Sequence, residues 1–168
     1  MAMGRIRQTL VARCRVKNPY FVRPQEKGTM RQLAPYLLAG SAAIVLLLGV
    51  LHLLYTFRGP KLVPRDAELQ ERMRVVSPVI TRETTMWKAW VGFNASHSFG
   101  AILFGLVYGY LALLHPVFLF ESVFLLVVGL VLLGGYTFLG VRYWFSVPFR
   151  GILLSLILYA LALIFAVA

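Results

Sequence analysis

Residues 87–114 read WKAWVGFNASHSFGAILFGLVYGYLALL, and this stretch decides the fold. After Lys88 it carries no charged residue, and it is longer than the about 20 residues that a helix needs to cross a hydrocarbon core. Its apolar residues run on without the period-two alternation of a barrel strand. The stretch therefore predicts a transmembrane helix, with an unusual polar segment, GFNASHSFG, at residues 92–100.

Three other apolar stretches are also longer than about 20 residues, at 33–57, 116–141 and 148–168. Only His115 separates the second stretch from the third, and the third and fourth are joined by a short segment. Short connections make neighbouring helices antiparallel. We therefore predict an all-α integral membrane protein, an antiparallel four-helix transmembrane bundle over residues 33–168.

The composition supports a membrane protein and excludes an ordinary soluble domain. Of the 168 residues, 60% are hydrophobic, and the mean hydropathy is +0.77. Charged residues make up 14%, well below the usual share of about 25%. The net charge of +11 comes from basic segments beside apolar spans, which suit anionic lipid headgroups, so it calls for no nucleic-acid partner. The expected partners are membrane lipids.

The segments outside the spans are a basic tail and one long loop. Loop 58–86 contains PRDAELQERMRVV, which predicts a short amphipathic helix at the headgroup level. Lys and Arg number 8 on the tail side and 9 on the loop side, so the positive-inside rule gives a tie. A start at Met30 removes all of the tail cations except Arg31. We expect residues 1–32 to be disordered or to follow a mis-assigned start, and loop 58–86 to be cytoplasmic.

Five polar residues converge on the half of the bilayer that faces loop 58–86. They are His52, Asn94, His97, Tyr136 and Arg142. His52 lies about 9 Å along its helix from Arg58, and Asn94 and His97 share one helix face three residues apart. Ionisable side chains inside a membrane point to function. These five residues form the predicted ligand site.

The chemistry of this site leaves several hypotheses open. Apolar walls with a few polar groups favour a lipid-like or quinone-like ligand, with Arg142 facing an anionic head. His52 and His97 are also candidate axial ligands of a b-type haem, although their depths differ by about 5 Å. A metal site is not predicted, because no carboxylate or thiol lies at that depth. No catalytic motif is present, which favours a non-enzymatic protein. The polar residues also fit simple hydrogen bonds between helices.

Small residues recur every four positions along the second span, in two rows. Such rows let neighbouring helix backbones approach closely in lipid. They predict helix packing within the bundle, in a homo-oligomer or against a membrane-protein partner. The alternative function is therefore a structural or accessory subunit. The residues of the two rows are Gly92, Ser96, Gly100, Ala101, Gly105 and Gly109.

The sequence resembles an uncharacterised family of small four-span bacterial integral membrane proteins. The resemblance rests on HLLYTF at 52–57 and on TRETTMWKAWVGFNASHSFGAILFGLVYGYLAL at 81–113, with a shared TTMW...GFNxSH core. It covers about residues 30–168 and leaves the basic tail outside. It implies a bacterial inner-membrane location and brings no substrate, cofactor or catalytic residue.

Overall fold

The computed structural model describes residues 28–168, and this part of the chain is almost entirely helical. Four helices are long and apolar enough to cross a membrane, as the sequence predicts. The chain is therefore an integral membrane protein with an all-α four-helix bundle. The helices are α2 (Thr29–Phe57), α3 (Ala67–Val75), α4 (Met86–Leu114), α5 (Pro116–Glu121), α6 (Val123–Tyr143) and α7 (Ser146–Val167).

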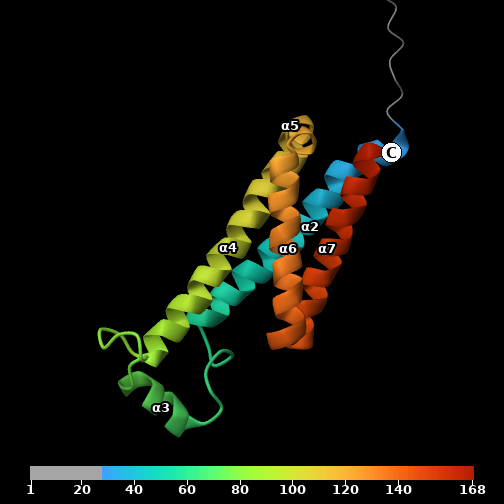
Figure 1. Ribbon diagram of the computed structural model, residues 1–168. Coiled ribbons are helices and arrows are strands. Elements are labelled where there is room, and N and C mark those ends of the chain that lie inside the picture. The colour runs from blue at the N-terminus through green and yellow to red at the C-terminus, as the bar shows by residue number, and fades with distance from the viewer. Residues whose placement is uncertain (1–27) are drawn as a thin grey trace, which may run out of the picture.

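The four spanning helices alternate in direction, so the bundle has two distinct ends (Figure 1). We call the end where α2 and α6 finish and α4 and α7 begin the loop end, because loop 58–86 and α3 lie there. The far end holds α5 and the C-terminus. The basic tail predicted at residues 1–32 falls mostly outside the described residues.

The third predicted span differs from the structure at its start. The chain forms the short helix α5 and restarts at Val123, so α6 is the spanning segment. Ser122 causes the restart, because its Oγ accepts a hydrogen bond from the Leu125 backbone N–H at 3.4 Å and caps α6. Figure 1 views α5 nearly end-on, so it lies across the far end as a connector. Glu121, expected inside the span, instead ends α5 and is exposed.

Helix α2 is the centre of the bundle and packs against both α4 and α7. Close packing comes from small residues: a Cβ added at Gly105 would lie 2.5 Å from Leu46 Cβ, and one at Gly49 would lie 2.9 Å from Ala101 Cβ. Helix α6 packs on α7. Backbones of α4 and α6 are further apart and are joined through aromatic side chains, such as Tyr108, whose hydroxyl donates to the Leu125 carbonyl at 2.6 Å.

Large apolar side chains cover the outside of the spanning helices. Phe99, Leu103, Phe124 and Phe138 are each more than half exposed. In water such a surface would be unstable, whereas in lipid it is the expected contact surface. The fold is therefore built to be solvated by hydrocarbon over most of its length.

Loop 58–86 is fastened to the bundle by specific hydrogen bonds. Trp90 Nε1 donates to the Leu62 carbonyl at 3.0 Å, and the Met86 backbone N–H donates to the Val76 carbonyl at 2.8 Å. Helix α3 begins at Asp66, whose carboxylate accepts from the backbone N–H of Glu68 at 2.9 Å. The loop is consequently an ordered part of the loop end.

Candidate functional site

Three aromatic rings from two helices meet in the loop half of the bundle. The ring centroid of His97 on α4 lies 5.2 Å from that of Tyr136 on α6 and 5.4 Å from that of Trp144. Trp144 is the C-cap residue of α6, and its ring centroid is 5.9 Å from that of Tyr136. We call His97, Tyr136 and Trp144 the ring triad. It fills the space between the separated backbones of α4 and α6.

Gly100 on α4 makes room for the Tyr136 side chain of α6. A Cβ at this position would lie 3.2 Å from the Tyr136 hydroxyl oxygen, so a larger residue would require the Tyr136 side chain to shift by a few tenths of an ångström. Gly100 lies three residues after His97 on the same helix face. The spacing therefore places the imidazole and the Tyr136 hydroxyl beside each other.

His52 and Asn94 form a second group beside the triad and are joined by a hydrogen bond. The Asn94 amide nitrogen Nδ2 donates to the Trp90 carbonyl at 2.8 Å, which leaves Oδ1 as an acceptor. His52 Nε2 lies 3.0 Å from that oxygen and therefore carries the proton and donates. The His52 ring then meets the His97 ring edge to face, with centroids 5.5 Å apart.

The polar atoms of the ring triad lack the partners that their neighbours have. Within residues 28–168, the ring nitrogens of His97, the hydroxyl of Tyr136 and the indole nitrogen of Trp144 form no hydrogen bond. Every fully buried side-chain nitrogen or oxygen in that range is paired. The triad's polar atoms are thus only partly buried and are open to an outside partner. A polar group inside a membrane gains from such a partner.

The structure gathers four of the five predicted ligand-site residues and leaves one apart. His52, Asn94, His97 and Tyr136 form the contacts described above. Arg142 lies in the last turn of α6, is exposed, and makes no hydrogen bond, ion pair or ring contact with the described residues. Its proposed contact with an anionic head therefore has no geometric support from its neighbours.

The two small-residue rows of α4 have different environments. Ala101, Gly105 and Gly109 face α2, and Gly105 is so close that a Cβ would meet the Ala42 carbonyl at 2.8 Å. In the other row only Gly100 has a neighbour. Gly92 has no atom within 4 Å of an added Cβ, and Ser96 is exposed with its hydroxyl donating to the Phe93 carbonyl.

Sequence reasoning missed two features of the polar interior. It did not include Trp144 in the predicted ligand site, whereas the structure places its ring beside His97 and Tyr136. It also overlooked Ser41 on α2 and Ser155 on α7, which are fully buried and hydrogen-bonded to each other with 2.8 Å between their Oγ atoms. A serine alone inside each span was the available signal, but nothing in the sequence pairs residues so far apart.

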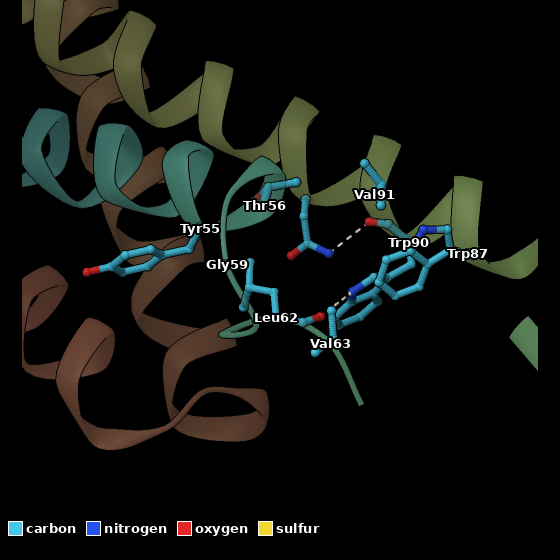
Figure 2. A pocket seen from close by; sticks show the side chains of 9 residues that line it. Tyr55, Thr56, Gly59, Leu62, Val63, Trp87, Trp90 and Val91 are labelled. Carbon is cyan, nitrogen blue, oxygen red and sulfur yellow. Dashed lines mark hydrogen bonds between the residues drawn. The ribbon is translucent and has the colours of Figure 1, made fainter. Parts of the chain in front are cut away.

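A small cavity adjoins Asn94 (Figure 2). Its volume is about 10 Å³, room for about one water molecule. Figure 2 shows Trp90 and Leu62 joined by their hydrogen bond at its edge. An organic ligand does not fit in this cavity, and no residue of the ring triad lines it. The cavity is lined by Tyr55, Thr56, Gly59, Leu62, Val63, Trp87, Trp90, Val91 and Asn94.

The histidine geometry does not fit a bis-histidine haem. Two axial imidazoles stand on opposite faces of a porphyrin and point one nitrogen each at the iron. Here the His52 and His97 rings touch edge to face, and His52 Nε2 points at Asn94. No room separates the rings for a porphyrin plane. Among the described residues, no group of three His, Cys, Asp or Glu side chains is placed to hold a metal ion.

Comparisons with family models, curated proteins and solved structures find no match to this chain. The resemblance to four-span bacterial membrane proteins accordingly stays a prediction. The function has to be argued from the site alone.

Proposed function

We propose that this chain is a non-enzymatic membrane protein that binds a lipid-like or quinone-like amphiphile at the ring triad. The observation that carries the proposal is the set of three adjacent polar ring groups without hydrogen-bond partners among residues 28–168. The neighbouring His52 and Asn94 are hydrogen-bonded to each other, whereas no polar atom of the triad has such a partner in that range. Few polar groups on apolar walls are typical of small-molecule sites.

The triad favours a head that accepts hydrogen bonds. The Trp144 indole nitrogen only donates, the Tyr136 hydroxyl donates, and a neutral His97 donates through one nitrogen. Carbonyl oxygens such as those of a quinone or an ester satisfy all three. An apolar tail finds a surface close by, because Phe99 on α4 and Phe138 on α6 are both exposed.

We also propose that the membrane is a bacterial inner membrane and that loop 58–86 faces the cytoplasm. In residues 28–168 the loop end carries nine of the ten Lys and Arg residues, and only Arg31 lies at the far end. Cytoplasmic segments near spans are enriched in these residues. A single cysteine placed at Thr84 in a Cys14→Ser background, labelled from outside intact cells, tests the orientation: labelling without permeabilisation contradicts it.

The binding proposal is tested by native mass spectrometry of protein released from nanodiscs made with bacterial lipid extract. Wild type is expected to carry a small molecule that His97→Ala loses. The matched control is His115→Ala, since His115 lies at the far end and is bonded to the Tyr110 hydroxyl. The mass of the bound molecule separates a quinone from a lipid. Wild type without any adduct, or equal retention by the two variants, contradicts the proposal.

A second candidate function is an accessory subunit, and the exposed half of the small-residue rows favours it. Gly92 and Ser96 face outward from α4 and have room for a partner helix. Gly92→Leu is then expected to abolish co-purification with the partner while the monomer keeps its stability. An unchanged set of co-purified chains contradicts this function.

A further inference from the structure

A second hollow lies outside the ring triad, at the loop end where α4 enters the membrane. It is an open groove of about 350 Å³ between loop 58–66, α3 and α4. One wall is Trp90, only four residues from the start of α4, which places the groove at the level of lipid headgroups. Its lining residues are Lys61, Leu62, Val63, Pro64, Met73 and Trp90.

The groove is held open by contacts within the protein. Trp90 Nε1 is fixed to the Leu62 carbonyl at 3.0 Å, so the loop and α4 keep their relative positions. Lys61 Nζ lies 4.1 Å from the centroid of the Tyr55 ring, a cation–π contact that ties the Lys61 side chain to the end of α2. The turn before Lys61 uses Gly59 at φ +84°, a conformation that glycine adopts freely. Because these contacts already fix the loop and its side chains, binding of an occupant requires little further loss of conformational entropy.

The segment that forms the loop and α3 walls of the groove has a net positive charge, because residues 58–75 contain five Lys or Arg and three Asp or Glu. Residues 58–65 read RGPKLVPR and contain Arg58, Lys61 and Arg65 without an acid. The next residue, Asp66, has its carboxylate engaged with the first backbone N–H groups of α3. The groove lining itself contains one cation and no acid. An occupant therefore needs a negative charge together with apolar carbons.

We propose that this groove binds an anionic phospholipid, with its phosphate beside Lys61 and its glycerol and first acyl carbons against Leu62, Val63, Met73 and Trp90. A free phosphate would leave the apolar walls uncovered, and a neutral lipid would leave Lys61 without a counter-charge. Basic pockets beside spanning helices recognise lipids in this way. The site is separate from the ring triad and does not depend on the function proposed for it.

The test uses the full-length protein in nanodiscs of equal parts phosphatidylcholine and phosphatidylglycerol. Native mass spectrometry then counts each lipid retained after gentle release. Wild type is expected to keep phosphatidylglycerol in preference to phosphatidylcholine. Lys61→Gln is expected to reduce that retention about fivefold, the fold-change that about 1 kcal/mol for one cation near the surface gives. Lys61→Arg keeps the charge and is expected to restore it.

The matched control is Arg82→Gln, which removes an exposed cation from the same loop outside the groove. It is expected to retain phosphatidylglycerol as wild type does. Equal losses in Lys61→Gln and Arg82→Gln would show a diffuse basic surface and overturn the proposal. Equal retention of the two lipids by wild type overturns it as well, and so does a bound peptide in place of lipid.

Discussion

Two polar clusters inside the spans differ in one decisive respect. Ser41 and Ser155 join α2 to α7, are fully buried, and satisfy each other, because Ser155 Oγ also donates to the Ser41 carbonyl at 3.1 Å. The ring triad joins α4 to α6, is only partly buried, and leaves its polar atoms without partners in residues 28–168. The serine pair is closed and the ring triad is open.

The difference distinguishes helix packing from the binding site proposed above. A closed pair converts polar groups into a link between helices, which in membranes is worth about 0.6 kcal/mol on average and about 1.7 kcal/mol at most. The polar atoms of the ring triad add no hydrogen bond to the fold, which leaves them available to the ligand proposed above. Substitutions in the serine pair should therefore change stability alone, and substitutions in the triad should change binding alone.

The largest change in the free energy of unfolding is expected from a substitution that disrupts the packing of α4 on α2, the contact on which both clusters depend. Gly105→Val places a Cβ against Leu46 and the Ala42 carbonyl, so α4 has to move away from α2. We expect the free energy of unfolding, measured by reversible denaturation in mixed micelles, to fall by about 3 kcal/mol, and any ligand to be lost. Gly92→Val is the control, because its Cβ meets no neighbour. A tolerated Gly105→Val would mean that the α2–α4 contact is loose.

The next effect concerns Asn94, the residue that keeps His52 paired. Asn94→Leu removes the acceptor of the His52 Nε2–H and leaves that group unsatisfied in a partly buried place. We expect a loss of about 2 kcal/mol in the free energy of unfolding. Ser96→Ala on the exposed face of α4 should change it by less than about 0.5 kcal/mol. Equal changes in the free energy of unfolding for the two variants would show that the His52–Asn94 hydrogen bond does not contribute to stability.

A smaller effect is expected at the closed cluster. Ser155→Ala leaves Ser41 without its partner on α7, and the free energy of unfolding should fall by about 1 kcal/mol with ligand retention unchanged. A double-mutant cycle with Ser41→Ala isolates the pair, since the second substitution should cost less in the background of the first. Additive costs, or loss of the ligand, would contradict the assignment of this pair to packing.

The smallest effect on stability is expected at the open cluster. Tyr136→Phe removes a hydroxyl that has no partner in the described chain. The free energy of unfolding should therefore change by less than about 0.5 kcal/mol. Ligand retention should fall about tenfold, because the ligand loses its hydrogen bond to that hydroxyl. Tyr159→Phe is the matched control: its hydroxyl donates to the Leu126 carbonyl at 3.0 Å, and its removal should cost about 1 kcal/mol and spare the ligand. The reverse pattern would show that the triad is packing.

Much of the fold and part of the site follow from local sequence. Continuous apolar runs locate four spanning helices, and the spacing of Asn94 and His97 places them on one face of α4. Connectivity brings His52 and Tyr136 to the same half of the bilayer. The start of α6 was harder to predict from the sequence. A single serine inside a long apolar run gives little sign that one helix ends there and another begins, and the cap that Ser122 forms on Leu125 is visible only in the structure. Arg142 was assigned to the site from its depth in the membrane alone. Depth does not say which way a side chain faces, and the Arg142 side chain is exposed and contacts none of the other four residues.

The sequence by itself determined that this protein spans a membrane four times, because transfer of long apolar segments into lipid depends on composition and length and hardly on neighbours. Tertiary structure alone decided that α2 is central, that Ser41 meets Ser155, and that Trp144 completes a triad with His97 and Tyr136. These features depend on the rotation of each helix about its axis. Rotation is set by close contacts such as Gly105 against Leu46, which become visible only when both helices are in place.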